Sequence, residues 1–240
     1  MQNTHQTNTP KTRLIALGFL IILSVLALSL LSCSSKKTTE QETFEKLNVG
    51  DIITFGAYQW KVLDVKSDRA LILAERSIGE MRYSTSDSMT KWRTSAVRTW
   101  LQEHLASNAF NDEERTRAIE VINKPDPNPY YDYVDDDQDV RDRIFLLTAK
   151  EVVQYFGDSG QLGTSANLND QYNANRIIEH STIDEDHVWW LRTSGRSLGF
   201  QPIVTHIGVI YLGGVPAAPP TPDYPGNTRP GVRPAMWIKM

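Results

Sequence analysis

The sequence DIITFGAYQWKVLDVKSDRALILAER, residues 51–76, carries the pattern of paired β-strands. Trp60, Val62 and Val65 fall near alternate positions, as the residues on one face of a strand do. Gly56 interrupts the first apolar stretch, and two alternating leucines follow a Ser-Asp turn further on. The stretch therefore predicts a group of neighbouring strands at the start of the domain.

Two helices are expected next. Ser95 can cap the first, because apolar and aromatic residues then recur at the spacing of one helix face. These residues are Val97, Trp100, Leu101, His104 and Leu105. Asn111 followed by Glu114 has the spacing of a capping box, which predicts a shorter helix that runs to about Ile122.

A third helix is expected between long irregular stretches. Thr148 and Glu151 form a second capping-box pattern, and Gly157 follows the last apolar residue of that segment. Residues 158–187 are polar and loop-like. Six of the twelve prolines lie between positions 216 and 230, which predicts a long surface loop there.

The chain ends in further strand patterns at residues 189–192, 204–211 and 232–238. Strands followed by helices and then by more strands indicate an α+β fold. A chain that stops on an apolar strand must bury that strand. We therefore expect the first and last strands to share one sheet, and residues 50–240 to be a single domain.

The N-terminal residues predict export and a lipid anchor. Two basic residues precede an apolar run at residues 14–31, which is the layout of a secretory signal peptide. The run ends in Leu-Leu-Ser before Cys33, and this ending resembles the lipobox of bacterial lipoproteins. Residues 1–32 are then a signal peptide, Cys33 is the acylated N-terminus, and residues 33–49 are a polar tether. An uncleaved membrane helix is the alternative, since 18 residues is close to the length that spans a bilayer.

Composition excludes several classes of function. The chain has 25 Lys and Arg against 29 Asp and Glu, and both basic residues of the signal peptide would be lost on cleavage. The remaining charge of −6 and the lack of a basic stripe make a nucleic-acid partner unexpected. Cys33 is the only cysteine, so disulfides, thiol catalysis and thiolate metal sites are excluded from the domain. We expect the protein in the cell envelope, anchored to the outer membrane or cell surface.

Five segments together resemble a known family. They are GDI to YQWKVL (50–63), Trp92 with SAVRTWL (95–101), DRIFLLT (142–148) with Glu151, WLRTSG (190–195) and GVRPA (231–235). As an ordered set, they resemble an uncharacterised bacterial domain of secreted and lipid-anchored proteins that has no assigned activity. WLR and GVRPA also resemble the C-terminal part of the superfold shared by C-type lectins and the formylglycine-generating enzyme.

This resemblance implies a lectin-like α+β domain with antiparallel strands, two to three helices and long loops. The superfold hosts formylglycine formation, sulfoxide synthesis and ligand display, so fold alone does not choose among them. Formylglycine chemistry needs thiols, and sulfoxide synthesis needs histidines on a partner helical domain. The sequence provides neither, and its histidines lack metal-ligand spacing.

Charged and aromatic residues supply the candidate site. Arg98, Arg192 and Arg233 each lie in a family-like motif, and guanidinium groups suit an anionic ligand. The alternative is that they hold loops in place through aspartates and backbone carbonyls. Tyr130 and Tyr131 lie in a predicted loop and are candidate anchors for a partner.

The same loop contains an aspartate cluster. Asp135, Asp137 and Asp139 alternate as in calcium-binding loops, which makes Ca²⁺ a candidate ligand although no cofactor is required. The glycine and the final glutamate of such loops are missing. An acidic surface loop, balanced by Arg141 and Arg143, is the alternative.

Two main functions follow from these observations. The first is a lipid-anchored surface protein whose non-catalytic domain binds an extracellular protein or glycan. The second is an extracytoplasmic enzyme of the hydrolase type that uses carboxylates of residues 126–142 and the three arginines. A purely structural envelope lipoprotein is a third.

Overall fold

The alternating residues at the start of the domain form a meander of three antiparallel strands. In the computed structural model these are β1 (Ile52–Phe55), β2 (Tyr58–Val65) and β3 (Arg69–Ala74). Trp60 and Val62 point into the core and are fully buried. The predicted strands and the turn at Gly56 are confirmed.

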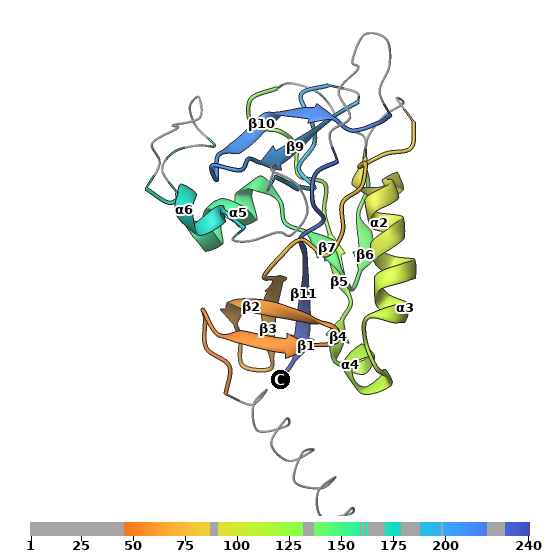
Figure 1. The fold of residues 1–240 in the computed structure, drawn as a ribbon, viewed down its shortest axis with the longest axis vertical. Helices are drawn as coiled ribbons and strands as arrows, with labels where there is room; N and C mark the ends of the chain where they lie inside the picture. The colour runs from red at the N-terminus through yellow and green to blue at the C-terminus, as the bar shows by residue number, and fades with distance from the viewer. Residues whose placement is uncertain are drawn as a thin grey trace, which may run out of the picture. The chain divides into compact units, whose positions relative to one another are not determined.

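The structure describes residues 46–86, 91–131, 137–158, 160, 162, 171–178, 188–197, 199–219 and 229–240. Residues Leu47–Met240 form one compact unit that combines antiparallel sheets with short helices, as Figure 1 shows. This arrangement confirms the α+β class.

The last strand lies in the middle of the large sheet. β11 (Pro234–Lys239) pairs with β3 on one side and with β4 (Ala118–Ile119) and β7 (Phe145–Leu146) on the other. The strand order is therefore β1-β2-β3-β11-β4, with β7 also paired to β11. The expectation that the first and last strands share one sheet is confirmed.

Two smaller sheets complete the β-structure. β8 (Trp189–Trp190), β9 (Phe200–Val204) and β10 (Ile210–Pro216) form one, and β5 (Val121–Asn123) pairs with β6 (Val140–Asp142) in the other. The predicted continuous strand at residues 204–211 is wrong in its middle, because residues 205–209 form the turn between β9 and β10 and only its ends belong to these strands. Gly208 has φ +78° in that turn, and a Cβ there would lie 2.0 Å from the Asn173 carbonyl oxygen.

The capped helices form where the sequence predicts them. The first runs through α2 (Ala96–Trp100), a π-helical turn (Leu101–Leu105) and α3 (Ala106–Asn108), after a 3₁₀ turn at Trp92–Thr94. The Ser95 hydroxyl accepts a hydrogen bond from the Arg98 amide, and both capping boxes are complete. α4 is only Asp112–Arg117, because the next residues join the sheets as β4 and β5 instead of extending to Ile122.

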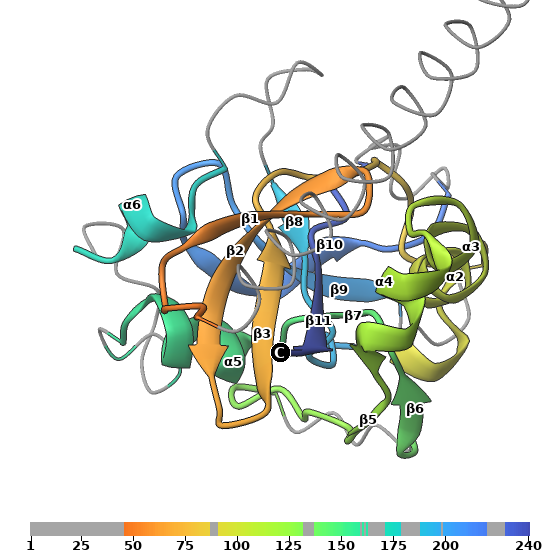
Figure 2. The same ribbon diagram turned by 90° about the horizontal axis from the view of Figure 1, so that it is seen from below.

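α5 (Ala149–Phe156) and α4 lie on different sides of the unit in both ribbon views, as Figure 2 shows from below. Phe110, which precedes α4, packs its ring against Phe55 and Trp60. A further short helix, α6 (Asn173–Arg176), lies in the stretch expected to be a loop. Its Arg176 is buried and donates to the Gly157 carbonyl oxygen, which joins α6 to the end of α5.

We predict that removal of residues 232–240 unfolds the domain. The deletion takes away the strand that pairs with β3, β4 and β7, together with the fully buried Met236 and Ile238. Near-UV circular dichroism and thermal melting should show loss of tertiary structure and of a cooperative transition.

The matched control is Lys239→Ala in the same strand. Its side chain is exposed, so we expect a change in unfolding free energy of at most about 0.5 kcal/mol. A truncated protein that keeps the wild-type dichroism and melting curve would contradict the central role of β11.

Candidate functional site

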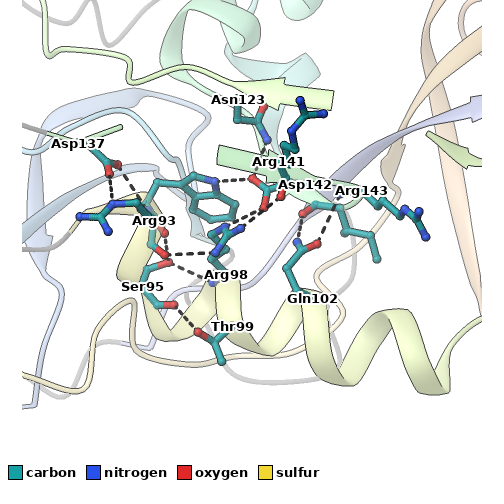
Figure 3. Close-up of polar contacts among 12 residues, drawn as sticks. Arg93, Ser95, Arg98, Thr99, Gln102, Asn123, Asp137, Arg141, Asp142 and Arg143 are labelled. Atoms are coloured by element: carbon teal, nitrogen blue, oxygen red, sulfur yellow. Dashed lines mark hydrogen bonds and ion pairs between the residues drawn. The ribbon is translucent and has the colours of Figure 1, made fainter. Parts of the chain in front are cut away.

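Arg98 is part of a buried network around Asp142. Arg98 lies in the first turn of α2, and Asp142 is the last residue of β6. The Arg98 Nε donates to Asp142 Oδ1 at 2.7 Å, as Figure 3 shows. Its other two nitrogens donate to the carbonyl oxygens of Arg93 and Arg141. The guanidinium of Arg98 is therefore used inside the fold.

Asp142 accepts from two more side chains. Trp92 Nε1 and Asn123 Nδ2 donate to its second oxygen at 2.9 and 2.8 Å, and the Asp142 side chain is fully buried. A buried carboxylate is stable only when its charge and lone pairs are satisfied. Asp142 thus joins the first helix to the β5–β6 ribbon.

Arg192 joins the start of α5 to another part of the chain. It donates to Glu151 Oε1 at 3.0 Å and to the Lys124 carbonyl oxygen at 3.1 Å. The second oxygen of Glu151 accepts from the Thr148 amide in the capping box. The same carboxylate therefore caps the helix and neutralises the arginine.

A second carboxylate near the start of α5 is Asp126, which is buried. Thr193 Oγ1 donates to Asp126 at 2.7 Å and accepts from the Ala149 amide. Lys150 Nζ lies 2.8 Å from the other Asp126 oxygen. Residues 126 and 193 are thus both attached to the first turn of α5.

Arg233 is the most deeply buried of the three arginines, with 3% of its surface exposed. Its Nε donates to the Ala74 carbonyl oxygen at 2.9 Å, and its charge lies 5.2 Å from the centre of the Trp189 ring. Burial lowers the pKa of Arg233 to about 10, against the opposing effect of Glu75. The group remains a cation at neutral pH.

The three arginines contact different partners. Arg98 pairs with Asp142 and Arg192 with Glu151, whereas Arg233 bonds to carbonyl oxygens at the end of β3. Within the described residues, no hydrogen-bond partner of one of these arginines is shared with another. Their contacts are those of groups that hold loops and strands together.

Tyr130 and Tyr131 are exposed, each with 39% of its surface accessible. The backbone beside them is fixed by buried Asn128, whose Nδ2 donates to the carbonyl oxygens of Ser194 and Leu212. The Asn128 Oδ1 accepts from the Tyr130 amide. Two exposed aromatic side chains therefore lie shortly after a residue, Asn128, that hydrogen bonds hold in place.

The aspartate cluster is described only in part. The Asp137 side chain is buried and its Oδ1 lies 3.6 Å from Arg93 Nε, whereas Asp139 is exposed. Asp135 lies outside the described residues. Across the described part of the chain, no three His, Cys, Asp or Glu side chains come close enough to hold a metal ion. Calcium binding stays a prediction.

The lipid-anchor residues also lie outside the described ranges, both Cys33 and the apolar run at 14–31. No helix within those ranges is long and apolar enough to cross a bilayer.

A model of the protein family described as Domain of unknown function (DUF6273) matches residues 67–240. The chain belongs to the DUF6273 family. The match begins in the turn before β3, so β1 and β2, which were expected to share the resemblance, lie outside the matched residues. No curated protein and no solved structure matches the chain. The lectin-like similarity stays a prediction.

The DUF6273 domain of this chain buries most of the residues in its motifs. Ile144, Phe145, Leu146 and Leu147 are core residues, as are Trp190 and Leu191. Polar motif residues are buried as well: Asp142, Thr148, Arg192, Thr193, Ser194 and Arg233. These motifs therefore specify internal contacts of the fold.

Sequence reasoning missed the partners that the arginines use. Asp142 and Glu151 stand in the quoted motifs, but local spacing gives no sign that they meet Arg98 and Arg192 over 44 and 41 positions. Asp126 lies among prolines and has no local pattern that predicts its bond to Thr193. The one usable signal was that Asp142 and Glu151, like Arg98 and Arg192, belong to the quoted set of motifs.

We predict that Asp142→Ala destabilises the DUF6273 domain by about 3–5 kcal/mol, because it leaves Arg98, Trp92 and Asn123 without their acceptor. Urea unfolding of the purified variant measures the loss.

Asp112→Ala is the matched control, since Asp112 also pairs with an arginine but its side chain is 97% exposed. Its cost should stay below about 1 kcal/mol. Equal costs for the two variants would show that the Asp142 network adds nothing to stability.

Proposed function

We propose that the protein is a lipid-anchored envelope protein whose domain binds an extracellular protein or glycan and catalyses no reaction. The observation that carries this proposal is the loop that begins at Asp126. The side chains of Asp126 and Asn128 bond to the rest of the fold, whereas Tyr130 and Tyr131 are exposed. A loop whose base is held by hydrogen bonds and whose aromatic side chains are exposed is suited to binding a partner.

Both ends of this loop are attached to the fold. Asp126 and Asn128 bond to residues 193 and 194 and to β10, and Asp137 lies against Arg93 at the other end. Because the base of the loop is already ordered, less conformational entropy is lost when a partner binds. The expected lectin-like superfold would add support, because that superfold displays ligands on its loops.

The enzyme alternative has less support. Asp126, Asp137 and Asp142 already have cationic or hydrogen-bonding partners within the domain. Burial, together with the carboxylates of Asp64 and Glu151, raises the pKa of Tyr155 to about 12. Tyr155 is therefore protonated at neutral pH.

The membrane part of the proposal rests on the sequence around Cys33. A diacylglyceryl group and an amide-linked chain on one residue would give a lasting anchor, which a single chain does not. The polar tether of residues 33–49 would then separate the domain from the lipid. The outer membrane or cell surface is the proposed location.

We predict that Cys33 is acylated. Cells fed an alkyne-labelled fatty acid should incorporate label into the wild-type chain and not into Cys33→Ala, because the cysteine sulfur is the acceptor. Ser35→Ala is the control and should be labelled like the wild type. Equal labelling of wild type and Cys33→Ala would refute the lipid anchor.

We also predict that Tyr130 and Tyr131 contribute to binding. The full chain in detergent is applied to a glycan array, with CaCl₂ and with chelator. A photoreactive side chain at the exposed position 129, next to the two tyrosines, tests for a protein partner in cells. Replacing both tyrosines by alanine should lower retention or cross-linking at least about tenfold, equivalent to about 1.4 kcal/mol.

Ile52→Ala serves as the control, because Ile52 is 48% exposed and lies on β1, outside this loop. It should bind like the wild type. Unchanged binding by the double tyrosine variant, with an unchanged melting temperature, would argue against this loop as the binding site.

A further inference from the structure

Two polar atoms beside the central strand are buried without a hydrogen-bond partner. They are NH1 of Arg233, which immediately precedes β11, and Oε2 of Glu75, which immediately follows β3. Buried polar atoms in folded proteins nearly always have partners, from the protein or from ordered water. Each of these two atoms therefore needs an explanation.

The surroundings of Arg233 restrict what can lie next to NH1. Its Nε donates to the Ala74 carbonyl oxygen and its NH2 to that of Glu75 at 3.5 Å. Its charge also lies within 6 Å of the ring centres of Phe156 and Trp189. The aromatic rings offer NH1 no hydrogen-bond acceptor of ordinary strength, and the nearby carbonyl oxygens are used by the other two nitrogens.

The charges of the pair select the kind of ligand. Glu75 contacts Arg233 through its own carbonyl oxygen, and its carboxylate also acts electrostatically on the guanidinium. A cation would be repelled by the guanidinium and an anion by the carboxylate. A small neutral molecule that both accepts and donates a hydrogen bond satisfies both atoms.

We propose that Arg233 NH1 and Glu75 Oε2 together bind one internal water molecule. The water accepts a hydrogen bond from the guanidinium and donates one to the carboxylate. Such waters occur about once per 27 residues in globular proteins and make about three hydrogen bonds each. This water would connect the end of β3 to the start of β11 and complete the contacts of the GVRPA motif. The inference is independent of the proposed function.

A crystal structure of the full chain at high resolution tests the site directly. We expect a water peak about 2.7–3.2 Å from both atoms. Glu75→Gln keeps an acceptor oxygen at the same position and should keep the peak. Glu75→Met has a similar volume but no such acceptor, and should lose it.

Thermal melting gives a second readout if the Glu75→Met crystals are not obtained. Removal of the carboxylate next to the buried guanidinium should lower the melting temperature by about 5 °C or more, and by less in Glu75→Gln. Glu80→Met is the matched control at an exposed glutamate, where we expect a shift below about 2 °C.

Either of two results would overturn the proposal. One is a wild-type structure in which NH1 and Oε2 contact each other directly or contact other protein atoms, with no water peak between them. The other is a Glu75→Met protein that retains the water peak or melts like the wild type.

Discussion

The central position of β11 is the constraint on which the rest of this fold depends. Its backbone supplies hydrogen bonds to β3, β4 and β7, so it joins three segments from distant parts of the chain. Just before it, Gly231 forms single bridges with Glu80 and with Trp189 of another sheet. A Cβ at position 231 would lie 2.1 Å from the Ser77 hydroxyl oxygen, so this crossing requires glycine. The approach to β11 therefore connects two sheets.

Buried charge is the second feature that shapes the domain. Asp142 and Glu151 each hold an arginine from another segment. Such pairs add little net stability compared with apolar packing, because both charges must leave water. They do impose geometry, since each arginine also bonds to backbone carbonyl oxygens that must lie in fixed positions. In this domain they fix where irregular segments attach to helices.

Local patterns predicted local structure well. The alternation around Trp60, the Ser95 cap and the two capping boxes depend on residues within a few positions of one another, and all three were confirmed. Ile119 illustrates the limit, because its pairing with Trp237 in β11 takes it out of the expected helix. The partners of the arginines could not be predicted for the same reason. Which carboxylate meets Arg98 or Arg192 is decided by contacts more than 40 positions apart, which spacing does not encode.

The order of the strands has a consequence for the synthesis of this protein. Arg233 bonds to the Ala74 carbonyl oxygen across 159 positions, so the inner edge of β3 stays without its neighbour until β11 has been synthesised. At about 5–20 residues per second, a ribosome takes on the order of 10–30 s to cover that interval. During this time the growing chain has the first three strands but cannot close its largest sheet. The large sheet therefore becomes complete only after β11 has left the ribosome.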